Sequence, residues 1–213
     1  MRQLSFIEQI LSEVDTAVRT LFVPKQRTSK REIPGAALAE QPLTKREKTH
    51  VAGLMRVNHA GEVCAQALYQ GQALTAQLVR VRTQMAQAAA EEIDHLAWCE
   101  ERLRALDSQP SLLNPLWYSG SLMLGIVAGL AGDRWSLGFV AETERQVAAH
   151  LAKHLKNVPE QDEKTRAILA QMHEDEAHHA DIAHHAGAAD LPLVIKQLMR
   201  GVATMMTKSS YYL

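Results

Sequence analysis

Cysteine, aromatic residues and net charge are all scarce in this chain, and each scarcity excludes a class of protein. Two cysteines among 213 residues are too few for a disulfide framework or a thiolate metal cluster, so we interpret Cys64 and Cys99 as small core residues. Aromatic residues make up 5% of the chain, which together with abundant Ala, Leu, Gln and Glu favours helices over sheets. A formal net charge of −1 gives no indication of nucleic-acid binding.

A secretory leader and a membrane-spanning run are also missing. Residues 1–20 alternate charged and apolar side chains without the long apolar core of a secretory signal, which predicts a reducing compartment. The most apolar stretch, residues 116–132, is short for a spanning helix, which needs about 20 residues. Trp117, Tyr118 and Trp135 near its ends favour a helix at the membrane interface, and a crossover helix buried against a bundle is the alternative. The basic, amphipathic C-terminal stretch leaves the same two choices open.

Histidine, in contrast, is abundant with ten residues, and two Glu-x-x-His elements stand out. One element joins Glu92 to His95, and the other joins Glu176 to His179. Residues three apart lie on one face of a helix, so each pair can direct a carboxylate and an imidazole to one point. These groups suit a borderline metal such as ferrous iron. A single element of this kind arises easily by chance in a helical chain, so the wider spacing has to decide.

Two further glutamates complete a repeated pattern. Glu62 precedes Glu92 by 30 residues, and Glu144 precedes Glu176 by 32. Residues equidistant from the turn of an antiparallel helical hairpin face each other, and the midpoint of the second pair falls beside Pro159, which breaks helices. No glycine or proline marks the midpoint of the first pair, near residue 77. The halves match nonetheless, because Glu144 follows Glu62 by 82 residues and Glu176 follows Glu92 by 84.

This repeat predicts two similar hairpins that bring four carboxylates and two imidazoles together, as in ferritin-like di-iron proteins. We predict an all-α, ferritin-like four-helix bundle built from two helical hairpins with a long apolar crossover, plus N- and C-terminal helices. Residues 1–44 form an N-terminal helix and linker, and residues 45–213 form the di-iron domain, with a membrane-interacting segment near 112–138. No catalytic side chain is expected beyond the ligands of two iron ions, which are Glu62, Glu92, His95, Glu144, Glu176 and His179.

Neighbouring polar residues are candidates for supporting roles. Imidazoles that bind metals usually donate their other N–H to a carboxylate or carbonyl, so Asp94, Asp175 and His150 are candidate partners, with ordinary surface polarity as the alternative. Glu91 and Glu142 lie off the apolar stripes of their helices and are therefore not chosen as ligands.

Four segments resemble the demethoxyubiquinone hydroxylases, a ferritin-like family of ubiquinone biosynthesis. Residues 56–62 (RVNHAGE) resemble the first motif of that family and are the most specific of the four segments. Residues 91–96 (EEIDHL) and 175–179 (DEAHH) resemble its two Glu-x-x-His helices, and residues 141–150 (AETERQVAAH) resemble the segment that carries its remaining glutamate. The resemblance extends from about residue 45 to the C-terminus, and all six ligand positions hold the expected residue types.

The resemblance implies an O2-dependent di-iron monooxygenase that hydroxylates the ring of a polyprenylated methoxy-methyl-benzoquinol, demethoxyubiquinol. Because that substrate lives in the bilayer, it also implies a peripheral protein on the cytoplasmic face of the inner (plasma) membrane. Other ubiquinone-biosynthesis proteins are expected partners, whereas the sequence identifies no electron donor and no nucleic-acid partner.

Three other functions compete with this interpretation. An iron-storage protein or ferroxidase would not need the apolar segment 116–132. A peroxidase or radical-generating subunit would need a tyrosine near the metals, and Tyr69 lies two helical turns from Glu62. A non-catalytic helical scaffold would leave the matched spacing of glutamates and histidines without a reason.

Overall fold

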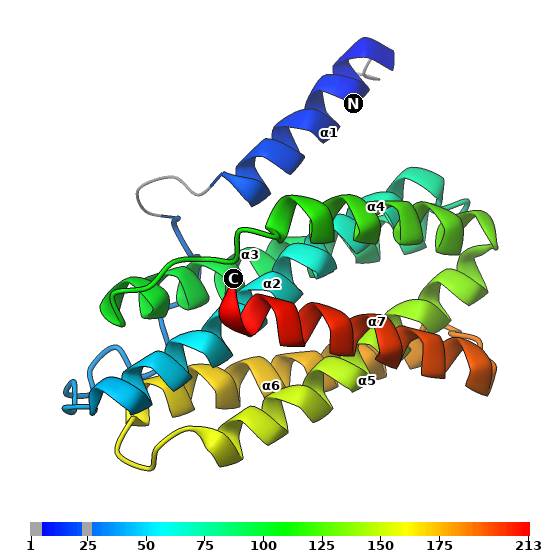
Figure 1. Cartoon of the computed structure of the whole chain (residues 1–213). Coiled ribbons are helices and arrows are strands. Elements are labelled where there is room, and N and C mark those ends of the chain that lie inside the picture. The colour runs from blue at the N-terminus through cyan, green and yellow to red at the C-terminus, as the bar shows by residue number, and fades with distance from the viewer. Residues whose placement is uncertain (1–5, 23–26) are drawn as a thin grey trace.

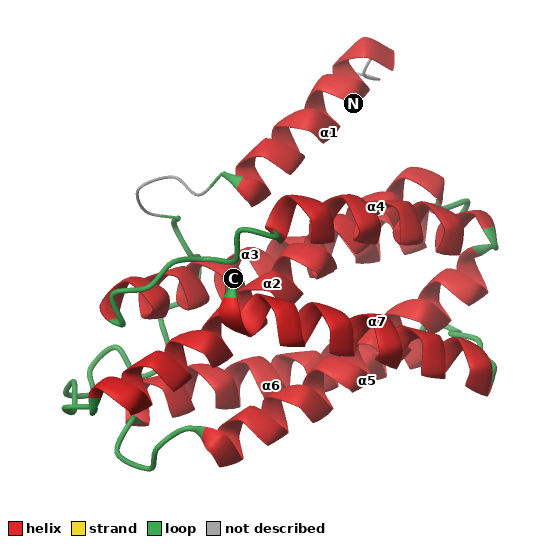
Figure 2. Cartoon of the chain, in the orientation of Figure 1, coloured by secondary structure: helices red, strands yellow, loops and turns green. Residues whose placement is uncertain are grey.

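The computed structural model describes residues 6–22 and 27–213, and this part of the chain folds into helices joined by loops, without a strand (Figure 2). Residues 1–5 and 23–26, which belong to the expected N-terminal helix and linker, lie outside the described residues. The helices are α1 (Phe6–Leu21), α2 (Lys45–Thr75), α3 (Val79–Ala105), α4 (Asn114–Leu130), α5 (Asp133–Asn157), α6 (Glu163–His185) and α7 (Leu193–Tyr212). The predicted all-α fold is confirmed.

Four of these helices form a bundle from two hairpins (Figure 1). Helices α2 and α3 pair, α5 and α6 pair, and the hairpins meet where α3 contacts α6 and α2 contacts α5. The loop between α5 and α6 contains Pro159, as expected. Asp162 caps α6 by accepting a hydrogen bond from the backbone N–H of Thr165 at 3.0 Å.

The first hairpin turns at residues 76–78, around the predicted midpoint, although no glycine or proline lies there. Asp133, the first residue of α5, accepts hydrogen bonds from the backbone N–H groups of Gln77 at 3.0 Å and Leu78 at 2.8 Å. A side chain from another helix therefore satisfies amides that the turn and the start of α3 would leave open. This dependence on a distant residue explains why the local sequence carries no turn signal.

The two largest apolar clusters of the core lie on either side of a polar layer, and a smaller third cluster joins α2, α3 and α4. One cluster contains Met55, Trp98, Leu151 and Leu169, and the other contains Tyr69, Met85, Leu137 and Ala183. Along each of the four helices, the glutamates and histidines of the predicted site lie between residues of one cluster and residues of the other. The apolar clusters thus seal the polar layer from both ends of the bundle.

Helix α4 is the crossover between the hairpins, and it packs along α2 through glycines. A Cβ atom added at Gly71 of α2 would lie 2.5 Å from the carbonyl oxygen of Leu122, and one added at Gly125 of α4 would overlap the carbonyl oxygen of Leu68. These glycines let the two backbones approach closely. The crossover therefore packs on the bundle, the arrangement that the sequence left as an alternative. Its outer face stays exposed and includes Leu116, Met123, Val127 and Leu130.

The terminal helices also reach α2. Helix α1 contacts α2 and α4, and Figure 1 shows its N-terminal end pointing away from the bundle. Helix α7 lies across α2 and also contacts α5. Its end is fixed by Tyr211, whose hydroxyl lies 2.7 Å from Nδ1 of His50 and whose carbonyl accepts a hydrogen bond from Arg56 at 2.6 Å. None of the described helices is both long enough and apolar enough to cross a bilayer.

Residues 27–43, which we call the strap, run from α1 to α2 across the outside of the bundle. Ile33 and Leu43 pack against the apolar cluster around Trp98, so the expected linker wraps the bundle instead of hanging free. The predicted division of the chain into two parts at residue 44 stays a prediction. The strap, which belongs to the first part, packs on the second part.

The glycine contact between α4 and α2 gives a matched pair of substitutions. Gly125→Ala should lower the free energy of unfolding by about 1–3 kcal/mol, because the new methyl group overlaps the backbone of Leu68. Gly120→Ala on the same helix meets no atom within 4 Å and should raise the free energy of unfolding by about 0.5–1 kcal/mol through helix propensity. Urea unfolding of both variants measures the two effects, and equal changes in the two variants would contradict the close packing.

Candidate metal centre

The structure brings all six predicted ligands into the polar layer of the bundle. Each of the four bundle helices contributes at least one ligand, at the height in the bundle that the hairpin midpoints predict. None of these six residues is more than 6% exposed. The contributions are Glu62 from α2, Glu92 and His95 from α3, Glu144 from α5, and Glu176 and His179 from α6.

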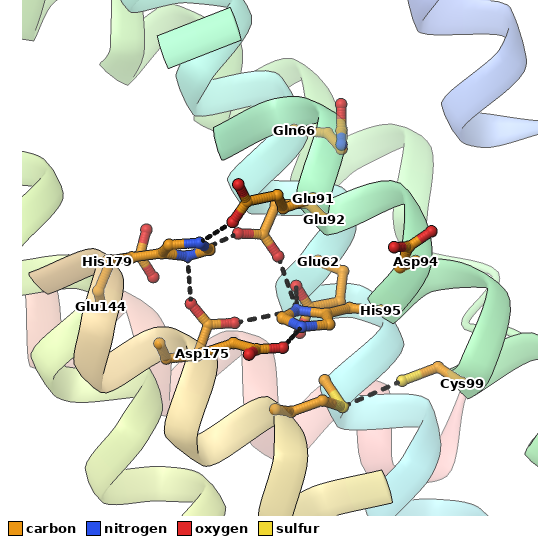
Figure 3. Close-up of polar contacts among 12 residues, drawn as sticks. Glu62, Gln66, Glu91, Glu92, Asp94, His95, Cys99, Glu144, Asp175 and His179 are labelled. Carbon is orange, nitrogen blue, oxygen red and sulfur yellow. Dashed lines mark hydrogen bonds and ion pairs between the residues drawn. The ribbon is translucent and has the colours of Figure 1, made fainter. Parts of the chain in front are cut away.

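His95 lies at the middle of three carboxylates (Figure 3). Its Nδ1 atom is 2.9 Å from Oε2 of Glu92, 3.2 Å from Oε1 of Glu176 and 3.7 Å from Oε2 of Glu62. Each of these four residues offers one ligand atom, and the atoms lie within 4.8 Å of one another. Atoms this close together can all bind one cation, which would then replace the direct contacts between His95 and the three carboxylates. All four residues are buried.

The second imidazole faces the other side of the same two glutamates. Nδ1 of His179 is 3.3 Å from Oε1 of Glu92 and 3.4 Å from Oε2 of Glu176. Glu92 and Glu176 therefore each present one oxygen to His95 and the other oxygen to His179. Two carboxylates that each connect two imidazoles form a cradle with two positions, one beside each histidine.

Glu144 closes the polar layer opposite Glu62. Its carboxylate accepts a hydrogen bond from the hydroxyl of Tyr69, which is itself buried. Burial, together with the charges of Glu176 and Glu92, raises the pKa of Glu144 well above its usual value. Burial and the charge of Glu92 raise the pKa of Glu62 in the same direction. The burial of both carboxyl groups therefore disfavours their charged forms.

The pKa values of Glu92 and His179 shift in the direction that favours a negative carboxylate and a positive imidazole. Burial would raise the pKa of Glu92, but the charge of His95 and the close contact with His179 outweigh the effect of burial and lower that pKa. Burial would lower the pKa of His179, but its close contacts with the carboxylates of Glu176 and Glu92 raise that pKa to about 12. The imidazoles therefore supply the positive charge that the buried carboxylates need, a charge that metal ions can supply instead.

Three atoms of the layer support the fit of metal ions. Oε1 of Glu92, Oε2 of Glu176 and Nδ1 of His179 are buried and have no hydrogen-bond partner in the described part of the chain. Buried polar atoms are almost always satisfied, so such a group of unsatisfied atoms that face one another needs an explanation. Carboxylate oxygens and imidazole nitrogens are the donor set that divalent iron accepts. The residues present therefore fit a metal centre.

Each imidazole is held from behind by an acidic residue of the opposite helix. Nε2 of His95 on α3 is 2.8 Å from Oδ2 of Asp175 on α6. Nε2 of His179 on α6 is 2.7 Å from Oε2 of Glu91 on α3. In both cases the acidic residue directly precedes the glutamate of a Glu-x-x-His element. Such carboxylates fix the tautomer and the orientation of metal-binding imidazoles.

Of the residues that the sequence suggested as partners of the site histidines, one contacts a site histidine and two do not. Asp175 contacts a site histidine, whereas Asp94 accepts hydrogen bonds from the strap instead. His150 lies elsewhere, with its ring 3.9 Å from the ring of His154. Glu142 forms an ion pair with Arg145 at 2.6 Å, outside the layer. Glu91 was not predicted to support a histidine, although both elements share the pattern acidic-Glu-x-x-His, which was a usable signal.

Comparison with known proteins gives consistent results along the whole chain. The model of the family described as "Ubiquinone biosynthesis protein COQ7" matches residues 49–210. The chain is 64% identical to the 3-demethoxyubiquinol 3-hydroxylase of Legionella pneumophila (strain Paris) over 213 residues, which is 100% of both chains. It is 56% identical to the protein of the same name from Acinetobacter baylyi, again over 100% of both chains.

The hydrogen bond from Tyr69 to Glu144 gives a prediction about metal affinity. Tyr69→Phe keeps the buried ring but removes the hydroxyl that orients the carboxylate, so we expect the affinity for cobalt(II) to fall about 10-fold. Titration followed by visible absorption measures this affinity. The matched control is Tyr118→Phe, which removes a hydroxyl bonded to Gln70 outside the layer and should leave cobalt affinity unchanged. An equal loss in both variants would contradict a specific role for Tyr69.

Proposed function

Because the chain belongs to the COQ7 family of ubiquinone-biosynthesis proteins, we propose that it hydroxylates the ring of a polyprenylated demethoxyubiquinol with O2. Full-length similarity supports this proposal, since the chain and its relatives align over 100% of both lengths. An enzyme that had lost the activity would be expected to have lost part of the centre, yet all six predicted ligand positions are filled and adjacent.

The cofactor that we propose is a pair of iron ions. The observation that carries this proposal is the bridging placement of Glu92 and Glu176, each of which presents one oxygen to each histidine. Glu62 would complete the position beside His95, and Glu144 would complete the second position. Four carboxylates balance two divalent cations, which removes the charge imbalance of the buried layer.

When bound, two ferrous ions would supply redox chemistry and coordination positions for O2. The net reaction replaces one ring hydrogen by a hydroxyl group and reduces the second oxygen atom to water, so it consumes two electrons and two protons. The protein positions the ligands through Asp175 and Glu91, holds Glu144 through Tyr69, and excludes water with the apolar clusters on either side. No side chain is assigned as a nucleophile.

A polyprenyl substrate requires contact with lipid, and we propose that the protein binds the cytoplasmic face of the inner membrane as a peripheral protein. Three helices with exposed apolar side chains, α1, α4 and α7, all contact α2. Helix α4 contains no charged residue. Helix α7 contains the basic residues Lys196, Arg200 and Lys208 and no acidic residue, which suits an anionic lipid surface.

The proposed centre is tested by metal content and turnover together. Purified protein should contain about two irons per chain, and Glu62→Ala and Glu176→Ala should each lose most of this iron and at least about 100-fold of the hydroxylation rate, because each removes a ligand. Iron assay and quinol product analysis on the same samples measure both quantities. Glu174→Ala serves as the control, because this glutamate is exposed on the same helix as Glu176.

Two outcomes would change the assignment. Two irons with O2 consumption but without a hydroxylated quinol would move the function to a ferroxidase or peroxidase and leave the metal centre intact. Absence of bound metal after reconstitution with ferrous iron under reducing conditions would rule out the di-iron proposal.

Membrane binding is tested with charged substitutions on α7. Leu198→Glu and Val202→Glu place a charge on exposed apolar positions, so each should weaken binding to vesicles of phosphatidylethanolamine and phosphatidylglycerol by roughly 10-fold or more without unfolding the protein. Vesicle co-sedimentation measures the affinity. Val79→Glu is the control, because Val79 is equally apolar and 76% exposed but belongs to α3. If the control weakened binding as strongly, α7 would not be the membrane surface.

A further inference from the structure

The strap reaches the metal centre, although it precedes residues 49–210, where the family model matches. Arg31 is the contact residue, and it connects the two hairpins. Its Nε atom donates to Oδ2 of Asp94 on α3 at 3.1 Å, and its Nη1 atom donates to Oδ2 of Asp175 on α6 at 2.8 Å. The backbone N–H of Lys30 donates to the other oxygen of Asp94 at 2.7 Å, which fixes the strap at this point.

The Arg31 guanidinium also contacts the rings of Trp98 and His95. Its Cζ atom lies 4.7 Å from the centroid of the Trp98 ring, a cation–π contact, and the Trp98 ring centroid lies 5.2 Å from that of His95. Nη2 of Arg31 is 3.3 Å from Nε2 of His95. Arg31 therefore touches both the imidazole of a proposed ligand and the carboxylate that supports this imidazole.

Two groups face Nε2 of His95: the carboxylate of Asp175 at 2.8 Å, which can accept its N–H, and the guanidinium of Arg31 at 3.3 Å, which cannot. A proton on Nε2 is therefore stabilised by Asp175, and Arg31 can act on it only by holding that carboxylate in place. A neutral imidazole has one N–H, and a guanidinium has only donors. Asp175 accepts from Arg31 and from His95 through the same oxygen, Oδ2. If Nε2 of His95 keeps the proton, it donates to this oxygen. The lone pair of Nδ1 then points towards Glu62, Glu92 and Glu176, which is where a metal ion would bind.

We propose that Arg31 is a positioning residue of the metal centre, which holds Asp175 against Nε2 of His95 so that Nδ1 faces the metal. This proposal rests on the proposed metal centre and adds a role for the N-terminal segment. The planar fork of arginine suits the task, because it binds Asp94 and Asp175 at the same time and stacks on Trp98. A lysine could not make these contacts together.

The other half of the centre lacks an equivalent clamp. Glu91, which supports His179, has a side chain that is 55% exposed, and within the described residues no arginine or lysine pairs with it. The two histidines are therefore held differently. Loss of Arg31 should weaken the metal position beside His95 and leave the position beside His179 nearly unchanged.

The remaining anchors of the strap provide a control. Glu40 accepts two hydrogen bonds from Arg102, at 2.8 and 2.9 Å, and its side chain is half-exposed. Arg102 belongs to the far part of α3 and touches none of the six proposed ligands. Glu40→Gln should loosen the strap to a degree comparable to Arg31→Gln without touching the support of His95.

The experiment is an anaerobic titration of the full chain with cobalt(II), followed by visible absorption, together with thermal unfolding of each metal-free variant. Wild-type protein should bind two equivalents. In Arg31→Gln, one of the two affinities should fall about 10-fold and the corresponding absorption band should change, while the other affinity stays within error. Arg31→Lys should give an intermediate loss, because it keeps the charge but not the fork. Glu40→Gln should lower thermal stability only.

A double variant tests the route through Asp175. If Arg31 acts by holding Asp175, the variant that combines Arg31→Gln with Asp175→Asn should lose no more cobalt affinity than Asp175→Asn alone. Additive losses would overturn this route. Unchanged affinities and spectrum in Arg31→Gln, or equal weakening of both positions, would overturn the proposal. Failure of the wild-type protein to bind cobalt or iron would instead refute the metal centre itself.

Discussion

Burial of four carboxylates in one layer of an apolar bundle is the constraint on which the rest of the structure depends. A buried carboxylate is costly unless opposite charge and hydrogen bonds surround it. Glu62, Glu92, Glu144 and Glu176 lie between two apolar clusters, so water cannot supply this compensation. Protons and imidazoles can balance the layer in part, as the raised pKa values of Glu62 and Glu144 indicate. Two divalent cations would balance it fully, which links the stability of the fold to its proposed chemistry.

The positions of the site residues were predictable because they follow from two local regularities. Helical periodicity places both members of a Glu-x-x-His element on one face, and hairpin symmetry places Glu62 opposite Glu92 and Glu144 opposite Glu176. Both regularities are properties of the chain near each residue and need no knowledge of tertiary contacts. The turn between α2 and α3 shows the limit of such predictions. Its position followed from the symmetry of the hairpin, but the residue that caps it, Asp133, lies more than fifty residues further along the chain.

The features that could not be predicted all depend on side chains that meet across long separations in sequence. Arg31 meets Asp94 and Asp175, which are 63 and 144 residues further along the chain, and no periodicity relates these positions. The packing of α4 was undecided for a similar reason, since an apolar run with glycines suits a membrane surface and a close helix contact equally well. Gly125 packs against α2 on one side, while Val127 is exposed on the other, so the helix contact occupies one face and membrane contact of the other face stays a prediction.

The two proposals of membrane binding and of an Arg31 clamp assign different tasks to the two faces of the bundle. Helices α1, α4 and α7 gather on α2 and present apolar side chains, whereas the strap covers α3 and α6 and clamps the support of His95. A lipid substrate needs an approach through flexible, apolar surroundings, but metal ligands need a rigid support. Under the proposed membrane binding, this separation would let the apolar side contact lipid without disturbing the orientation of His95. It also gives a role to the strap, which contains none of the proposed ligands but binds α3 and α6 beside His95.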